Sequence, residues 1–236
     1  MKIDFILPVY NEQSILKTSL NHLYTFLQVN TTYEWRIIIA DNASTDDTPT
    51  IAAALASEFF EVSTLRFEKK GRGFALRQTF QASQADVVAY MDIDLSTNLH
   101  HINDLVKGLQ SGYDIVIGSR LLPDSKTDRS FKREIISRGY NLLVRLLFGN
   151  VCSDLQCGFK AFRIGAIKNL LPVVEDDRFF FDTEVLLQAK HNGSEILDVP
   201  VEWIENPDSR VDLLPTILED LLGLWRVRLN LSRPFF

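Results

Sequence analysis

The stretch Val87-Val88-Ala89-Tyr90-Met91-Asp92-Ile93-Asp94 is an apolar run that ends in two carboxylates separated by one residue. A short apolar run rich in β-branched residues and bounded by polar residues predicts a buried strand. Such strands lie inside sheets covered on both faces, and ligands bind beyond the carboxyl ends of these strands. Asp92 and Asp94 follow such an end, which favours a functional site over a solvated acidic turn.

Two carboxylates this close repel each other, and a nearby cation is what keeps both of them ionised. A divalent ion bound by only one or two carboxylates usually completes its coordination with water and substrate phosphates. We therefore predict that Asp92 and Asp94 bind Mg²⁺ or Mn²⁺ together with a diphosphate.

Composition and charge narrow the class of protein. The chain has 236 residues, of which 46% are hydrophobic, and this predicts a globular protein with a sizeable core. A formal net charge of -6 does not favour nucleic acid as a partner. Residues 129–168 nevertheless hold eight Lys or Arg side chains against two acidic ones, a local net charge of +6. This stretch predicts an anionic partner, with a solvated basic face as the alternative.

The location is predicted from what the sequence lacks. Cys152 and Cys157 match neither a zinc-binding pattern nor a redox Cys-x-x-Cys motif, so we expect buried thiols in a reducing compartment. No secretory signal opens the sequence, and no uninterrupted apolar run is long enough to span a bilayer. We expect a cytoplasmic protein that is soluble or peripheral at the cytoplasmic face of a membrane.

The first half of the chain alternates predicted strands and helices. We expect strands at 3–9, 36–40, 62–67, 87–91 and 114–117, helices at 15–27, 49–60 and 99–109, and a loop running into a helix at 71–83. Crossovers of this length join parallel strands, so the pattern predicts an α/β protein with a mostly parallel sheet.

The alternation weakens after residue 120. We expect a polar loop at 121–130, a basic amphipathic helix at 131–148, a strand at 156–163, a helix at 182–190, a strand at 196–203 and a last helix at 213–229. We interpret residues 1–236 as one domain with two functional halves, 1–120 and 121–211, followed by a C-terminal helix at 212–236.

Three predicted strand ends in the first half carry polar groups. They are Tyr10-Asn11-Glu12, Asp41 and the acidic pair Asp92 and Asp94. In a parallel sheet these ends meet at one edge. Tyr10 can stack on a base, Asp41 can bind a ribose or a base edge, and the acidic pair with a metal can hold a diphosphate. A nucleoside diphosphate fits this set.

Other phosphate-binding classes match less well. The sequence has no Gly-x-x-x-x-Gly-Lys-Ser/Thr motif, and Gly71-Arg72-Gly73 follows the third predicted strand rather than the first. The segment 92–96 looks like the aspartyl-phosphate motif of haloacid-dehalogenase-type phosphatases, with Asp176-Asp177 imitating their late acidic pair. That motif normally follows the first strand, so a phosphatase remains the alternative enzyme class.

Several motifs taken together resemble the family 2 glycosyltransferases, which have the GT-A fold, a Rossmann-like, mostly parallel sheet flanked by helices. The matching segments are 7–12, 41–46, 92–94 and 118–120. Segments 133–141, 154–163, 181–184 and 199–203 resemble the polyprenyl-phosphate branch, the dolichyl-phosphate glucose and mannose synthases and their bacterial relatives. The resemblance covers nearly the whole chain.

The resemblance implies inverting transfer of a hexose from a nucleoside diphosphate sugar to a polyprenyl phosphate, with Asp92 and Asp94 meeting ribose, metal and diphosphate. By analogy, the nucleoside is held by Pro8, Tyr10, Glu12 and Asp41, with Asn11 beside them. Arg120 and Arg133 match positions that bind the acceptor phosphate, and Arg210 matches a basic position near the donor diphosphate. The segment 156–160 favours UDP-glucose as donor, with GDP-mannose possible.

Three features leave alternatives open. Asp182 matches an acid that is the catalytic base in many family members, whereas phosphate-acceptor members use it for orientation; an N-cap is the structural alternative. Ser96 stands where mannose synthases often have Gln, a better metal ligand. The segment 213–236 suits a helix in a membrane interface as well as one packed on the domain. A carbohydrate acceptor, or nucleotide-sugar binding without catalysis, also remains possible.

Overall fold

The structure is a computed structural model that describes residues 1–205 and 213–231, and it confirms the predicted α/β architecture. The strands are β1 (Lys2–Val9), β2 (Glu34–Asn42), β3 (Val62–Phe67), β4 (Val87–Met91), β5 (Ile115–Ser119), β6 (Lys126–Asp128), β7 (Phe159–Arg163), β8 (Ile196–Pro200) and β9 (Glu202–Ile204). The helices are α1 (Leu16–Asn30), α2 (Thr48–Glu58), α3 (Arg72–Ala82), α4 (Ile102–Gln110), α5 (Phe131–Phe148), α6 (Ile164–Leu170), α7 (Phe181–His191) and α8 (Leu213–Leu231), with short 3₁₀ turns at Leu99–His101 and Leu171–Val173.

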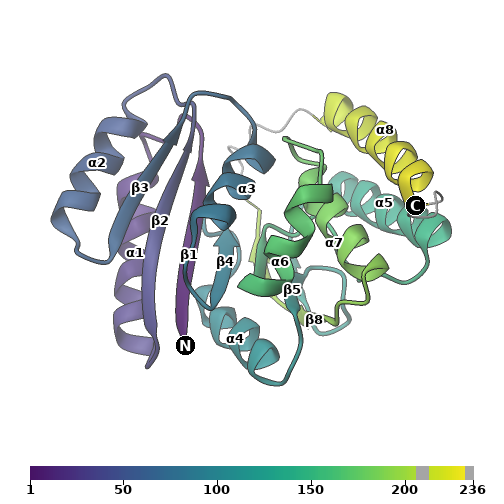
Figure 1. The fold of residues 1–236 in the computed structure, drawn as a ribbon, viewed down its shortest axis with the longest axis horizontal. Helices are drawn as coiled ribbons and strands as arrows, with labels where there is room; N and C mark the ends of the chain where they lie inside the picture. The colour runs from purple at the N-terminus through teal and green to yellow at the C-terminus, as the bar shows by residue number, and fades with distance from the viewer. Residues whose placement is uncertain (206–212, 232–236) are drawn as a thin grey trace.

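Seven strands form one central sheet in the order β3-β2-β1-β4-β7-β5-β8 (Figure 1). The chain builds outward from β1 to β3 and then returns to place β4 on the other side of β1. The crevice at such a reversal, outside the carboxyl ends of the strands, is where open α/β sheets bind ligands. The loops that follow β1 and β4 flank this crevice.

One strand of the sheet runs against the others. β7 lies between β4 and β5 and pairs antiparallel with both, while the remaining pairs are parallel. Its register places Phe159 opposite Met91, the last residue of β4. The loop before β7 therefore reaches the edge of the sheet that carries the ends of β1, β2 and β4.

Both faces of the sheet are buried, which explains the continuous apolar runs of the strands. Phe5 and Leu7 of β1 pack into one core with residues from α1, α2 and α4. Ile6, between them, packs into a second core with residues from α3, α5, α6, α7 and α8. Each fully buried aliphatic or aromatic side chain contributes roughly 1.5–3 kcal/mol to folding.

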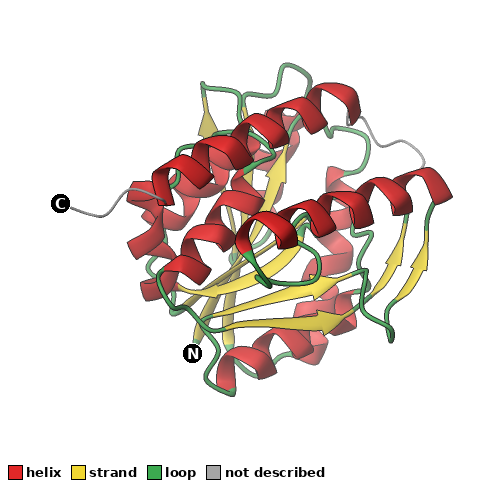
Figure 2. Cartoon of the chain, turned by 90° about the vertical axis from the view of Figure 1, so that its right-hand side faces the viewer, coloured by secondary structure: helices red, strands yellow, loops and turns green. Residues whose placement is uncertain are grey.

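The two longest helices lie on one side of the molecule. α5 and α8 contact each other and run side by side on the face that Figure 2 turns to the viewer. Within the described residues, no helix combines the length and the apolar character that a membrane span requires.

The second half differs from the sequence prediction in three places, one of which is helix α6 (Ile164–Leu170), where no element was predicted. The predicted strand at 196–203 is two strands, since β8 joins the main sheet and β9 leaves it to pair with β6. The predicted loop at 121–130 contains β6, so that prediction was wrong for residues 126–128. Lys-Thr-Asp is too short and too polar to show the alternation by which a strand is recognised.

Candidate active site

The loops that follow β1 and β2 are tied together by hydrogen bonds. Asn11, at a positive φ of 57°, donates its backbone N–H to Ser44 Oγ at 3.0 Å. Its side-chain Oδ1 accepts from the Thr45 N–H at 2.8 Å. The Glu12 N–H donates to Thr48 Oγ1 at 2.8 Å. The Asn11 side chain, predicted to bind substrate, therefore bridges two loops in this structure.

Asp41 is the penultimate residue of β2 and is fully buried. One carboxylate oxygen accepts the Ser44 N–H at 3.0 Å. The other, Oδ2, has no hydrogen-bond donor among the residues that the structure describes, although Arg66 Nε lies 3.7 Å away. Buried polar atoms are rarely left unsatisfied, so this oxygen is available to a donor on a ligand. The observation fits the predicted contact with a nucleoside.

Tyr10 and Pro8 lie on either side of the end of β1. Pro8 is the penultimate residue of the strand and stands opposite Ala40. The ring of Tyr10 carries the ammonium of Lys70 at 3.8 Å from its centroid, within the range of a cation–π contact. A base that stacks on this face of Tyr10 must displace Lys70.

Asp92 and Asp94 lie at the carboxyl end of β4, as predicted. Leu95, at a positive φ of 51°, turns the chain sharply, and the Ser96 N–H donates to Asp94 Oδ1 at 3.1 Å. A small cavity of about 10 Å³ adjoins both carboxylates; its walls are Met91, Asp92, Asp94, Leu95, Ser96, Thr97, Gly158 and Trp203. This is space for about one water-sized particle. Carboxylate oxygens are the ligands that Mg²⁺ and similar hard cations prefer, so this donor set fits the predicted metal.

Gly158, in the loop before β7, leaves the space that the Asp92 carboxylate occupies. A Cβ at position 158 would stand 1.9 Å from Asp92 Oδ2, far inside contact distance. The Asp92 N–H also donates to the Gly158 carbonyl at 3.2 Å. A side chain at position 158 therefore cannot coexist with this position of the carboxylate.

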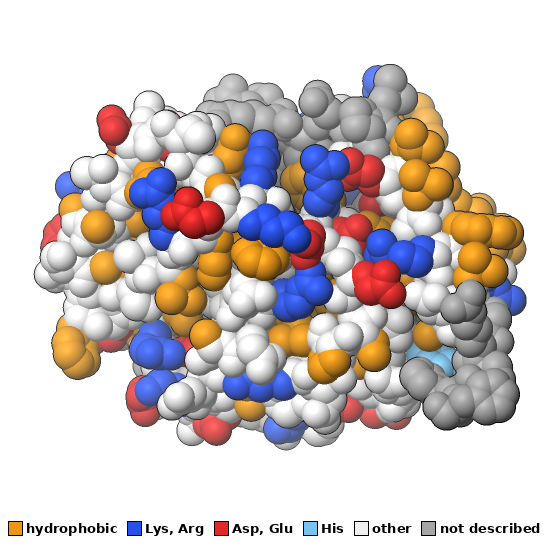
Figure 3. Space-filling view, turned by 45° about the horizontal axis from the view of Figure 1, so that its top comes forward, with side chains coloured by type: hydrophobic (Ala, Val, Ile, Leu, Met, Phe, Trp, Pro, Cys, Tyr) orange, Lys and Arg blue, Asp and Glu red, His pale blue; other side chains and the backbone are white. Residues whose placement is uncertain are grey.

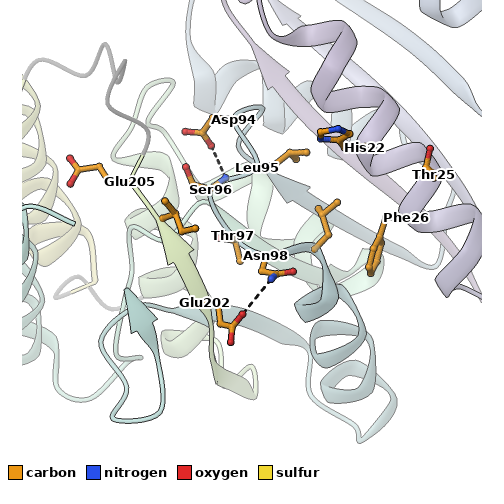
Figure 4. Close-up of a pocket in the computed structure, with 12 residues that line it drawn as sticks. His22, Thr25, Phe26, Asp94, Leu95, Ser96, Thr97, Asn98, Glu202 and Glu205 are labelled. Carbon is orange, nitrogen blue, oxygen red and sulfur yellow. Dashed lines mark hydrogen bonds between the residues drawn. The ribbon is translucent and has the colours of Figure 1, made fainter. Parts of the chain in front are cut away.

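A wider cleft of about 930 Å³ begins at Asp94 and runs between α1 and β9 (Figure 4). Its walls are His22, Thr25, Phe26, Asp94, Leu95, Ser96, Thr97, Asn98, Leu99, Glu202, Ile204 and Glu205. Figure 4 shows Asp94 and Glu205 near one end of the cleft and Phe26 near the other.

Asp182, a candidate base, orienting residue or N-cap, does not occupy the N-cap position of α7. It is the second residue of α7, whose N-cap is Phe180, and its side chain makes no capping bond. Asp182 Oδ1 accepts from Tyr90 OH and from Lys160 Nζ, the latter at 2.8 Å, and Oδ2 accepts from Arg72. The N-cap alternative is therefore wrong. Burial raises the pKa of Asp182, and Arg72 opposes that effect.

Three partners of Asp182 were not predicted as site residues. Tyr90 and Lys160 belong to buried strands, and Arg72 was weighed only as part of a glycine motif. Lys160 is fully buried and also donates to the Cys157 carbonyl at 2.6 Å. Burial lowers its pKa to about 8. A charged side chain inside an apolar strand segment was the one sequence signal that pointed to this network.

The two predicted acceptor-side arginines each hold a carboxylate. Arg120 binds Asp154 through Nε at 2.7 Å and Nη2 at 2.9 Å, and its guanidinium lies 5.5 Å from the ring centroid of Trp203. Burial acts to lower the pKa of Arg120, but the Asp154 carboxylate, helped by Asp92, raises it above its ordinary value. Arg133 binds Glu205, at the rim of the wider cleft, at 2.9 Å. Arg210 lies outside the described residues.

A histidine cluster near β9 is not a second metal site. Ligand atoms of His100, His101 and Glu202 lie within 4.8 Å of one another. However, His101 Nε2 accepts the Glu202 backbone N–H at 2.9 Å, and Nδ1 bonds Asp104 at 2.8 Å. Both ring nitrogens of His101 are thus engaged by the protein.

These features describe an α/β protein whose candidate site lies at the reversal point of its sheet. The chain belongs to glycosyl transferase family 2, whose family model matches residues 4–171. The match includes the segment 92–96 and contradicts the phosphatase interpretation. Asp177, half of the supposed late acidic pair, instead binds Lys69 and Arg77.

Curated relatives confirm the resemblance to the polyprenyl-phosphate branch. The chain is 38% identical over 230 residues to glycosyltransferase AglD of Haloferax volcanii; the match covers 95% of this chain but only 36% of AglD. It is 28% identical to the dolichyl-phosphate beta-glucosyltransferase ALG5C of Trichomonas vaginalis, over 98% of this chain and 75% of that protein. The Saccharomyces cerevisiae dolichyl-phosphate beta-glucosyltransferase is 26% identical, over 95% of this chain and 76% of that protein.

A solved structure confirms the fold. Glucosyl-3-phosphoglycerate synthase from Mycobacterium tuberculosis, crystallised with Mn²⁺, UDP and phosphoglyceric acid, has a TM-score of 0.72 and 18% sequence identity. The match covers 99% of this chain and 80% of the synthase.

Proposed function

We propose that this chain transfers glucose from UDP-glucose to a polyprenyl phosphate, with inversion, using Mg²⁺ or Mn²⁺ bound by Asp92 and Asp94. The proposal rests on the position of the small cavity of about 10 Å³, which lies between Asp92, Asp94 and the loop that leads into β7. The names of the dolichyl-phosphate glucosyltransferase relatives support the acceptor and the sugar. The Mn²⁺ and UDP bound by the synthase of the same fold support the cofactor and the nucleotide.

The donor occupies the edge of the sheet. The unsatisfied Asp41 Oδ2 accepts a hydrogen bond from the nucleoside, and Tyr10 stacks on the base after Lys70 moves away. Pro8 and Glu12 line the same end, and Arg210 is assigned to the diphosphate. The divalent ion, when bound, neutralises the leaving diphosphate.

The acceptor binds through the arginines. Arg133 exchanges Glu205 for the acceptor phosphate, while Arg120, fixed by Asp154, adds positive charge beside Asp92. A phosphate oxygen is already anionic near neutral pH and needs no strong base. This agrees with Asp182, whose two oxygens are occupied by Tyr90, Lys160 and Arg72 and which we assign to positioning.

The membrane surface is the proposed location, at its cytoplasmic face. Exposed apolar side chains gather on α5 and α8, at the right-hand end of the face in Figure 3. They are Phe131, Ile135, Leu142, Leu146 and Leu147 on α5 and Leu218, Leu221, Leu222, Trp225 and Leu229 on α8. Apolar patches flanked by exposed basic residues, here Lys132, Arg145 and Arg228, suit an anionic lipid interface.

The activity test uses the purified chain with labelled UDP-glucose or GDP-mannose, Mn²⁺ and a polyprenyl phosphate in detergent micelles. We expect label in the lipid extract with UDP-glucose. Label transferred only to added oligosaccharides would favour a carbohydrate acceptor, and nucleotide binding with no transfer would favour a binding protein. Arg133→Ala should raise the KM for the lipid about tenfold or more. Arg138→Ala, on the same helix, should not.

The membrane test measures binding to anionic lipid vesicles by sedimentation. The double substitution Leu222→Glu and Trp225→Glu should reduce binding at least about tenfold. Phe60→Glu is the matched control, because Phe60 is 99% exposed but lies beyond the end of α2. Equal loss in both variants would contradict the assignment of α8 to the membrane surface.

A further inference from the structure

Arg72 begins α3 and lies between two carboxylates of the candidate active site. Its Nη1 donates to Asp182 Oδ2, and its Nη2 donates to Asp92 Oδ1 at 2.9 Å. The two carboxylates differ in exposure: the side chain of Asp182 is 6% exposed, whereas that of Asp92 is 50% exposed. The guanidinium therefore has one buried end and one open end.

The buried end is fixed by several elements. Asp182 comes from α7 and is also held by Tyr90 of β4 and Lys160 of β7. Separating a buried carboxylate from its cation leaves an uncompensated charge, which is strongly unfavourable. Arg72 consequently stays attached to Asp182 whatever happens at its other end.

The open end is exchangeable. A half-exposed ion pair contributes little, because water screens the charges and solvates them once they separate. Asp92 is also one of the two carboxylates assigned to the metal. A divalent ion in the adjoining cavity competes with Arg72 for the same carboxylate.

We propose that Arg72 is a tethered, exchangeable cation that neutralises Asp92 until metal and nucleotide bind and that then binds the donor diphosphate. This inference rests on the proposed function, since it takes Asp92 as a metal ligand. When the ion displaces Nη2 from Asp92, Nη1 remains on Asp182. The released N–H groups then face the diphosphate that arrives with the ion.

The exchange couples metal binding to nucleotide binding. Without nucleotide, the ion must displace Nη2 of Arg72 from Asp92, and no other anion takes the place of Asp92 beside the guanidinium. With nucleotide present, the diphosphate supplies that compensation. Each ligand then strengthens the other by the same factor, because coupling free energies are reciprocal.

The test measures Mn²⁺ affinity by electron paramagnetic resonance of the free ion, in the presence and absence of UDP. Arg72→Met should bind Mn²⁺ about three- to fivefold more tightly than the wild type without UDP, the size of one exposed ion pair. The same variant should bind UDP more weakly in the presence of Mn²⁺. Arg72→Lys keeps the charge but loses the planar guanidinium that reaches both carboxylates. Its Mn²⁺ affinity without UDP should therefore lie between those of the wild type and Arg72→Met.

Arg178→Met is the matched control, since Arg178 follows Asp177 and pairs with Glu219 rather than with Asp92. It removes the same charge and should leave Mn²⁺ affinity unchanged; an equal gain in this variant would show general charge rather than exchange. If the wild type binds Mn²⁺ with UDP but Arg72→Met gains no affinity without UDP, the exchange is wrong and the proposed function stands. If neither protein binds Mn²⁺ with UDP, both fail. Thermal unfolding of each variant verifies that it is folded.

Discussion

The two ends of the active site are built by different forces. At the end that we assign to the nucleoside, the nucleoside end, which is formed by the loops after β1 and β2, hydrogen bonds between the loops hold the backbone and leave Asp41 Oδ2 without a donor among the described residues. At the transfer end, formed by Arg72, Asp92, Arg120, Lys160 and Asp182 with their partners, each of these charged side chains is already paired. On the proposed function, the nucleoside finds an open acceptor at the first end, whereas at the second end a ligand has to replace a protein partner.

The largest expected effect comes from removing the carboxylate of Asp94, which we propose as a metal ligand. Asp94→Ala should lower kcat by at least about a hundredfold, because the charge on the leaving diphosphate loses its stabilisation. The glucosyl transfer assay and UDP titration measure this. Asp86→Asn, an exposed acid at the opposite end of β4, is the control. An Asp94→Ala protein with normal kcat would mean that glucosyl transfer does not depend on the Asp94 carboxylate.

The next effect tests the close contact behind Asp92. Gly158→Ala places a methyl group on the carboxylate and should lower kcat about ten- to a hundredfold, with little change in the KM for UDP-glucose. Gly165→Ala, at a position with open space, should be silent in the same assay. A normal kcat for Gly158→Ala would show that Asp92 works from another position.

Paired substitutions test the comparison directly. Asp182→Asn leaves Arg72 and Lys160 without their buried counter-charge and should lower the free energy of unfolding by about 3–5 kcal/mol. Asp41→Asn keeps the loop hydrogen bonds and should instead raise the KM for UDP-glucose with little change in stability. Urea unfolding and donor kinetics separate the two. If Asp41→Asn has a lower free energy of unfolding than Asp182→Asn, the proposed difference between the two ends is wrong.

The smallest effect concerns Asp220, a buried residue of α8 that accepts a hydrogen bond from Gln156 at 2.6 Å. Burial raises its pKa to about 7, above the value of an unfolded chain. The folded state therefore binds the extra proton, and the stability that this provides is present at low pH and lost as pH rises through about 7.

Asp220→Asn should raise Tm by about 2–4 °C at pH 8, with the difference shrinking towards pH 5. Calorimetry at both pH values measures this, with the exposed Asp124→Asn as control. A Tm difference that does not depend on pH would contradict the role of this carboxyl group.

Local patterns predicted much of the fold and the gathering of polar residues at the end that we assign to the nucleoside. The apolar runs located the parallel strands, and the polar residues after β1, β2 and β4 meet at one edge. The transfer end was predicted only in part, since Arg72 and Asp182 are 110 residues apart and Tyr90 and Lys160 lie in apolar strands. No local pattern marks residues that meet only through tertiary packing. The short strand β6 was missed because three polar residues show no alternation, and β9 was merged with β8 into one predicted strand.

Because β7 runs antiparallel to its neighbours, residues at its start rather than at its end reach the candidate active site. In a purely parallel sheet, residues that follow strands reach the ligand, but β7 runs the other way, so the residues that precede and begin it arrive there. Gly158 and Lys160 thus come from the start of a strand. The loop upstream, which carries Asp154 and Gln156, is continuous with Gly158, while Asp220 of α8 holds Gln156. A displacement of α8 would therefore pull on Gln156 through Asp220, and through the loop on the backbone of Gly158, which contacts Asp92.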